Sequence, residues 1–210
     1  MFGETPDDRV ARFTRWAVDL GARALERACG RARVVPRDLG ALVVTTCTGY
    51  LCPGLSSYLA ERCGLRPDAF LLDLAGMGCA AAAPALEAAA GWVRQARRPA
   101  AVVSAEIATA TFEMGEDLSL IISNAVFADG ASALVVGPDE GTLRWAGSAR
   151  RHLPAYRDDV RFVHREGRLH NRISARLPRL VARAAKEVVD ELLATAGLGP
   201  VEIRRWAVHP

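Results

Sequence analysis

The stretch from residue 70 to residue 87 constrains the fold of this chain more than any other part of the sequence. An apolar run at 70–75 predicts a buried strand, and the alanine-rich run that follows predicts a helix. Gly76 and Gly78 lie between the two runs, and they allow a sharp turn because glycine adopts backbone angles that other residues avoid. Such a strand, turn and helix would present Cys79 at the bend.

Two roles are open to the thiol of Cys79. A cysteine at the N-terminus of a helix lies close to unpaired backbone N–H groups and to the positive end of the helix dipole, which favour the nucleophilic thiolate. The alternative is a small buried side chain on a core helix. Pro84 cannot donate a backbone hydrogen bond, so we expect an irregular first turn or a regular helix that starts near Ala81.

Helical and strand patterns alternate along the first part of the chain. A helix with Asp7 or Asp8 as its N-cap is predicted to run to Gly30, because apolar residues recur there at helical spacing. This alternation indicates an α/β fold with a largely central, buried sheet. The other predicted elements are strands at 41–46, 100–106 and 131–136, a loop at 47–54, and helices at 55–63 and 118–127.

The pattern changes after Gly137. The Arg- and His-rich stretch at 150–172 has no periodicity that supports an assignment. The remaining predicted elements are a strand at 142–149, a long helix that Pro178 opens and Gly197 ends, and a strand at 205–208 that leads to His209.

Composition excludes several classes of protein. The chain has 210 residues, half of them hydrophobic, and a net charge of +3, which suits a globular core and gives no indication of a nucleic-acid or membrane partner. Its five cysteines are odd in number and lack Cys-x-x-Cys or Cys/His spacing, so the sequence predicts neither a disulfide framework nor a metal site. A reducing cytoplasm fits this pattern, and the start of the chain is not a signal peptide.

Three segments together resemble the thiolase superfamily, and specifically type III polyketide synthases of the chalcone synthase kind. They are the Gly-Met-Gly-Cys run at 76–79, the run with Phe-Ala-Asp-Gly-Ala at 124–133, and Trp-Ala-Val-His-Pro at 206–210. Residues 104–106 and 45–54 also match the family. The resemblance therefore covers nearly the whole chain.

The resemblance implies a layered αβαβα fold of which this chain holds one nearly complete half and the start of the second. Residues 1–138 would form the N-terminal half with the nucleophile, without its first strand and helix. Residues 139–210 would begin the C-terminal half and end at the histidine. Family members are longer at both ends, so we expect this chain to be truncated at both, with the family's catalytic asparagine outside it.

The function that the resemblance implies is an acyltransferase that condenses a starter acyl-CoA with malonyl-CoA. Cys79 would accept the starter as a thioester, and His209 would keep Cys79 ionised and donate a hydrogen bond to the thioester oxygen of malonyl-CoA. Phe127 would be a gatekeeper between the acyl-CoA tunnel and the cavity. Coenzyme A thioesters would be substrates, with no separate cofactor, and the protein would be a homodimer.

Other positions have a weaker claim to function. Glu106 is expected to be a structural carboxylate near the pocket, and Asp129 to shape a turn through its side chain. Plain packing is the competing explanation for each of four positions that match the family's cavity lining or its dimer-facing edge: Cys47, Cys52, Ala108 and Thr111.

Two alternatives remain open at the level of sequence. One is another condensing enzyme of the same fold, such as a ketoacyl synthase III or a hydroxymethylglutaryl-CoA synthase; the His-Pro at the end of the chain favours the polyketide synthase. The other is a non-catalytic truncated remnant that pairs with another subunit.

Overall fold

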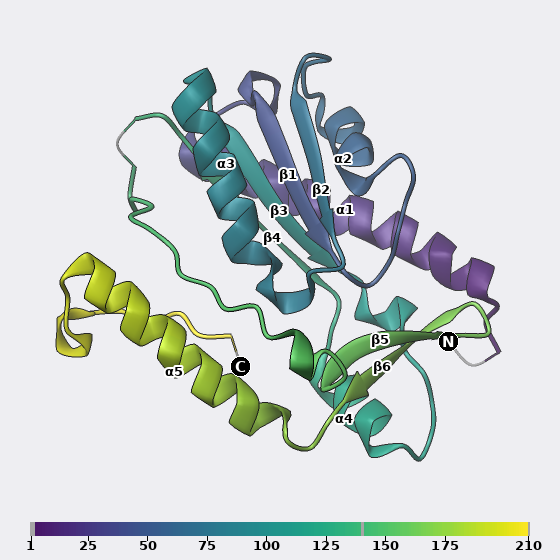
Figure 1. The fold of residues 1–210 in the computed structure, drawn as a ribbon. Coiled ribbons are helices and arrows are strands. Elements are labelled where there is room, and N and C mark those ends of the chain that lie inside the picture. Colours follow the sequence, from purple (N-terminus) through teal and green to yellow (C-terminus); the bar gives the residue numbers. More distant parts are fainter. Residues whose placement is uncertain (1–2, 140, 210) are drawn as a thin grey trace.

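The computed structural model describes residues 3–139 and 141–209, and the first part of the chain forms a four-stranded sheet between helices (Figure 1). The strands are β1 (Ala41–Thr46), β2 (Phe70–Ala75), β3 (Ala100–Glu106) and β4 (Gly130–Val136). They lie in the order β2-β1-β3-β4. The first three run parallel, and β4 runs antiparallel to β3. Each strand lies within one residue of its predicted bounds.

Helices cover both faces of this sheet. α1 (Pro6–Ala32) and α2 (Leu55–Cys63) pack on one face, and α3 (Ala82–Ala96) packs on the other (Figure 1). Side chains of β1 alternate accordingly, because successive residues of a strand point to opposite faces. Val44 belongs to the core under α1 and α2, and Val43 to the core under α3. The prediction of a buried central sheet is confirmed for β1 and β3.

Residues 70–75 form the predicted strand, but the prediction that this strand is buried is wrong. The strand exists, but Phe70 is 47% exposed and Leu71 is 37% exposed. β2 lies at the edge of the described sheet and pairs only with β1. An apolar run alone could not distinguish this edge strand from a central one, because neighbours on both sides decide burial.

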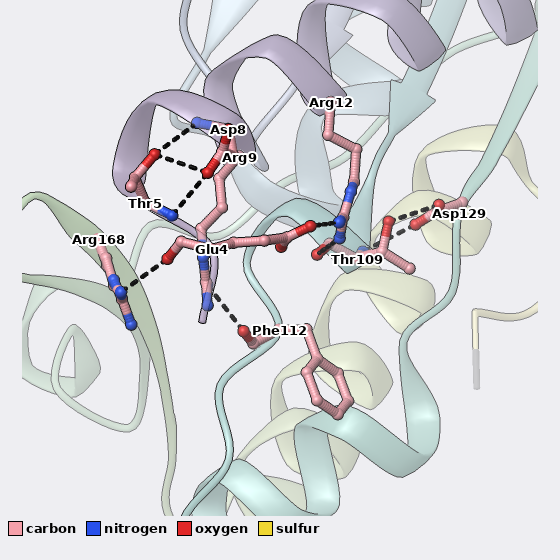
Figure 2. A network of polar contacts seen from close by, with 9 residues as sticks. All are labelled: Glu4, Thr5, Asp8, Arg9, Arg12, Thr109, Phe112, Asp129 and Arg168. Carbon is pink, nitrogen blue, oxygen red and sulfur yellow. Dashed lines mark hydrogen bonds and ion pairs between the residues drawn. The ribbon is translucent and has the colours of Figure 1, made fainter. Parts of the chain in front are cut away.

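The N-cap of α1 also differs from the prediction. Thr5, and not Asp7 or Asp8, caps the helix, and Pro6 occupies its first turn. The Thr5 hydroxyl accepts a hydrogen bond from the Asp8 N–H at 3.2 Å, and the Asp8 carboxylate accepts one from the Thr5 N–H at 2.9 Å (Figure 2). Asp8 therefore completes a capping box from inside the helix.

Three further elements, with α4, lie outside the layers of this sheet (Figure 1). α4 (Leu118–Val126) packs against β6 (Arg168–Ile173), which pairs with β5 (Val160–Arg165) as an antiparallel hairpin. The Arg- and His-rich stretch without a predicted structure thus contains this hairpin. α5 (Leu177–Ala196) is the predicted long helix, and Gly197 ends it with a left-handed φ of 67°.

Two predicted strands are wrong. Residues 142–149 and 205–208 form no strand, although the first contains Leu143 and the second Val208. These two side chains are 90% and 78% exposed. Within the described ranges, neither segment pairs with another strand, and an isolated strand is unstable without such hydrogen bonds.

Among the helices in the described ranges, none combines the length and the apolar character needed to cross a membrane.

Candidate active site

Two of the candidate site residues, Cys47 and Cys79, lie at one edge of the sheet. β1, β2 and β3 run parallel, so their carboxyl ends meet there, and the start of β4 joins them because Gly130 pairs with Glu106. Cys47 follows β1 directly, and Cys79 follows β2. In open α/β sheets, this is the edge at which ligands bind.

Cys79 lies at the bend that the glycines create. Gly76 and Gly78 have left-handed φ values of 75° and 57°, and the 3-10 turn η2 (Gly78–Ala81) precedes the regular start of α3 at Ala82. The expected irregular first turn is therefore confirmed. The side chain of Cys79 is exposed, so the alternative of a buried core cysteine is wrong. An exposed thiol ahead of a helix N-terminus is accessible to an electrophile.

Glu106 holds the loop that carries Cys47. Its carboxylate accepts hydrogen bonds from the Cys47 N–H at 2.9 and 3.0 Å, from the Thr48 N–H at 3.0 Å and from the Thr48 hydroxyl at 2.7 Å. The same hydroxyl accepts from the Ile107 N–H at 2.8 Å. These bonds confirm the structural role expected for Glu106, and they fasten the residues after β1 to the end of β3.

The Cys47 thiol is held in its neutral form. Burial raises its pKa most, and the charge and hydrogen bond of Glu106 and the charge of Cys79 raise that pKa further. Cys47 is half-buried, whereas Cys79 is exposed.

The 3-10 turn η3 (Ala108–Ala110) is fixed from two sides through Thr109 (Figure 2). Asp129 accepts hydrogen bonds from the Thr109 N–H at 2.8 Å and from its hydroxyl at 2.7 Å. Arg12 donates to the Thr109 carbonyl at 3.0 Å. Asp129 thus fixes the turn η3 through its side chain.

A buried ion pair extends this network along α1. Arg9 donates to the Phe112 carbonyl at 2.7 Å and pairs with Glu113 at 3.0 Å (Figure 2 shows the first contact). Arg168 of the β5–β6 hairpin pairs with the same Glu113 oxygen at 3.3 Å and donates to the Glu4 carbonyl at 2.9 Å. The segment after β3 is therefore tied both to α1 and to the hairpin.

The remaining cavity candidates lie around this turn and loop. The Thr111 hydroxyl donates to the Ala108 carbonyl at 3.0 Å. Phe127 is the C-cap of α4 and is 38% exposed, so it is not the core residue that packing alone would require. Cys52 is exposed in the loop between β1 and α2.

The structure places His209 outside the regular elements. It is exposed, and it follows the 3-10 turn η5 (Pro200–Glu202) in a segment without strand pairing. Pro210, the other half of the predicted His-Pro motif, lies outside the described residues. The partnership of His209 with Cys79 stays a prediction.

The sequence reading missed the polar residues that hold the site together. Thr48, Thr109 and Arg12 take part in several of the bonds described above. The hydroxyl residues directly after strand 41–46 were a usable signal, because Ser and Thr at strand ends bind nearby backbone groups. Arg12 gave no such signal, since its partner lies 97 residues away.

Other features of the described residues lie away from this site. Two open hollows of about 310 and 670 Å³ lie beside Trp16 of α1 and beside Leu65 after α2, and Cys79 lines neither. In the part of the chain that the structure describes, no three His, Cys, Asp or Glu side chains are grouped to hold a metal ion.

Comparison with known proteins gives one consistent family. The profile of the FAE1/type III polyketide synthase-like protein family matches residues 12–153. A 3,5-dihydroxyphenylacetyl-CoA synthase of Streptomyces toyocaensis is 32% identical over 222 residues, which cover 98% of this chain and 56% of that protein. A 1,3,6,8-tetrahydroxynaphthalene synthase of Streptomyces peucetius subsp. caesius is 30% identical over 200 residues, covering 91% of this chain and 52% of that one.

Solved structures agree. The germicidin synthase of Streptomyces coelicolor, a type III polyketide synthase, superimposes with a TM-score of 0.86 at 28% identity, over 94% of this chain and 53% of that one. The chain thus spans about half the length of the relatives it matches. Because the family profile matches well over half of its residues and the fold agrees, this chain belongs to the FAE1/type III polyketide synthase-like family.

Proposed function

We propose that this chain carries the nucleophile of a type III polyketide synthase, an acyltransferase that condenses a starter acyl-CoA with malonyl-CoA. The observation that carries the proposal is the exposed Cys79 at a glycine-built bend, at the carboxyl edge of a sheet with this family's fold. The relatives' names, which include a 3,5-dihydroxyphenylacetyl-CoA synthase and a 1,3,6,8-tetrahydroxynaphthalene synthase, support a polyketide product.

In the first step, the Cys79 sulfur attacks the thioester carbonyl of the starter. The bond to coenzyme A breaks, its thiol leaves, and the acyl group stays on Cys79 as a new thioester. Malonyl-CoA then loses carbon dioxide, and the resulting enolate carbon attacks the acyl group, which frees the Cys79 thiol. His209 would stabilise the thioester oxygen of malonyl-CoA by donating a hydrogen bond, because negative charge builds up there during decarboxylation.

Substrate selection would lie with the side chains around η3 and the loop after β1. We propose that Cys47, Ala108 and Thr111 line the acyl cavity, with Phe127 at its entrance and Cys52 at an edge that faces a second copy. Support comes from the arrangement of these residues around the carboxyl edge. The contact between Thr111 and Ala108 places two of them on one turn.

We also propose that the protein is a homodimer in a reducing compartment such as the cytoplasm. All five cysteines are free thiols, as in proteins of such compartments. α4 exposes large apolar side chains, among them Leu118 at 64% and Val126 at 63%. Exposed apolar surface of this kind marks an interface. Light scattering at micromolar concentration should give twice the mass of the chain, and a monodisperse monomer would contradict the dimer.

Acyl loading tests the central claim. The reduced chain is incubated with an acyl-CoA and mapped by mass spectrometry, and we expect a thioester adduct on the peptide that contains Cys79. Cys79→Ala should lose this adduct. Cys52→Ser, which removes another exposed thiol, should keep it. An adduct on Cys52, or equal modification of several cysteines, would refute the assignment of the nucleophile.

A further inference from the structure

Two cysteines follow neighbouring strands at the carboxyl edge of the sheet. β1 and β2 are paired in parallel up to Thr46 and Ala75, Cys47 is the next residue after β1, and Cys79 belongs to η2, which follows β2. Residues of η2 have Cα atoms within 8 Å of residues of β1. A disulfide needs Cα atoms roughly 4.4–6.8 Å apart, so forming one requires Cys47 and Cys79 to approach to that range.

The two thiols differ in accessibility. Cys79 is exposed, so a small oxidant reaches it first, whereas Cys47 is half-buried and anchored through Glu106. Cys29 and Cys63 belong to the layer formed by α1 and α2, where Cys29 is part of the core and Cys63 packs against it. An accessible thiol with a shielded thiol beside it is the arrangement that converts oxidation into a reversible disulfide.

We propose that Cys47 and Cys79 form a reversible disulfide when a peroxide oxidises Cys79, so that Cys47 protects the exposed thiol from irreversible oxidation. The proposal goes beyond polyketide synthesis. It depends only on the two thiols and a peroxide, and acyl loading plays no part in it.

The chemistry balances in two steps. The Cys79 thiolate attacks one peroxide oxygen, the O–O bond breaks, and the departing hydroxide or alkoxide takes a proton, which leaves a sulfenic acid on Cys79. The Cys47 sulfur then attacks the Cys79 sulfur. The S–S bond forms, the S–OH bond breaks, and the hydroxide leaves as water with the proton of the Cys47 thiol. Two thiols are oxidised to one disulfide, and one peroxide is reduced.

Glu106 gives the second step a proton acceptor. A buried thiol is a weak nucleophile until it loses its proton, and the Glu106 carboxylate lies beside the residue that must lose it. The carboxylate would take the proton from the Cys47 thiol and release it to the leaving hydroxide. A thiol-based reductant would reverse the disulfide by exchange.

Peptide mapping without reduction tests the proposal on the full chain. The reduced protein is treated with a small excess of hydrogen peroxide, its remaining thiols are alkylated, and it is digested. We expect a cross-linked pair of peptides that contain Cys47 and Cys79, lighter than the two thiol peptides by two hydrogen atoms and separated again by dithiothreitol. Cys52→Ser removes an exposed thiol of the same loop and should leave this cross-link unchanged.

Cys47→Ser gives a second readout. Without the second thiol, several-fold more Cys79 should reach the sulfinic acid, seen as a gain of two oxygen atoms, at the same peroxide dose. The wild-type mapping uses no variant, so a folding defect of Cys47→Ser would leave the first readout intact. Three results would each overturn the proposal: a cross-link from Cys79 to Cys52 in place of Cys47, no cross-link in the wild type, or equal sulfinic acid in the wild type and in Cys47→Ser.

Discussion

The carboxylate of Glu106 accepts hydrogen bonds from the backbone N–H of Cys47 through both of its oxygens, at 2.9 and 3.0 Å. The contact joins the first residue after β1 to the last residue of β3, which are 59 positions apart in the sequence. With its two bonds from Thr48, Glu106 fixes the loop after β1 at the carboxyl edge of the sheet. A carboxylate with several N–H and O–H donors holds a loop more firmly than packing alone, because bonds to a charged acceptor are stronger than neutral ones.

Replacing Glu106 should therefore loosen the loop and destabilise the chain. Glu106→Ala leaves the N–H groups of Cys47 and Thr48 without their acceptor, and we expect the free energy of unfolding to fall by about 2–3 kcal/mol. Glu106→Gln keeps one acceptor oxygen and should cost less. Urea denaturation measures both, with the exposed Glu187→Ala on α5 as the matched control, expected within about 0.5 kcal/mol of the wild type. Equal stability of all four proteins would contradict the role of Glu106.

Cys79 should be the first cysteine to react with iodoacetamide at neutral pH. Cys29 is buried, burial raises the pKa of Cys63 to about 11, and burial with Glu106 raises the pKa of Cys47. These three thiols are therefore protonated at pH 7, and a protonated thiol is a poor nucleophile. Cys52 is the informative comparison, because it is also exposed, in the loop that precedes α2. Time-resolved peptide mapping checks the order, and modification of Cys29 or Cys63 as fast as Cys79 would contradict it.

Asp159 should make the free energy of unfolding depend on pH in the acidic range. Hydrogen bonds from Arg176, at 2.6 and 2.9 Å, and from Ser174 hold the pKa of this buried carboxyl below its usual 3.8. A lowered pKa in the folded state contributes stability that is present above the unfolded pKa and is lost as the pH falls through the folded pKa. The wild type should therefore be more stable than Asp159→Asn at pH 6, and this advantage should shrink below about pH 4.

Unfolding free energies of the two proteins across this pH range provide the measurement. Arg176→Met removes the partner of Asp159 and should abolish the same acid-sensitive contribution. An advantage of the wild type that stays constant down to about pH 2 would show that ionisation of Asp159 is not involved.

The cavity assignment predicts a change of starter preference without a change in thiol reactivity. Thr111→Leu removes the hydroxyl that donates to Ala108 and adds bulk, and Cys47→Phe adds bulk in the loop directly after β1. Cavity side chains discriminate substrates by about 1–3 kcal/mol per methylene-sized change, so the relative rates of Cys79 acylation by short and long acyl-CoAs should shift by about tenfold or more.

Mass spectrometry of the Cys79 adduct measures these rates, and iodoacetamide labelling of Cys79 is the reactivity control. Thr195→Leu changes the same residue type on the exposed face of α5 and should leave the preference unchanged. If both cavity variants keep the wild-type preference, Thr111 and Cys47 are packing residues.

The sequence by itself determined most of the local structure. α2 begins and ends at the predicted residues, and Gly197 ends α5 as expected. The bend at Cys79 was readable because glycine with a left-handed φ is a local requirement of the backbone. Apolar periodicity and turn residues act over a few neighbouring positions, which is why these elements and the position of the candidate nucleophile could be predicted.

Only the tertiary structure decided which strands have partners and which polar groups meet. Residues 142–149 and 205–208 have strand-like patterns, yet a strand also requires a neighbour to bond, and no local pattern supplies it. β2 became an edge for the same reason. Glu106 reaches Cys47 across 59 positions and Arg12 reaches Thr109 across 97, because the packing of α1 and the register of β1 against β3 bring these groups together. The position of Cys79 could therefore be predicted from local sequence, whereas the polar contacts around the site depend on long-range packing.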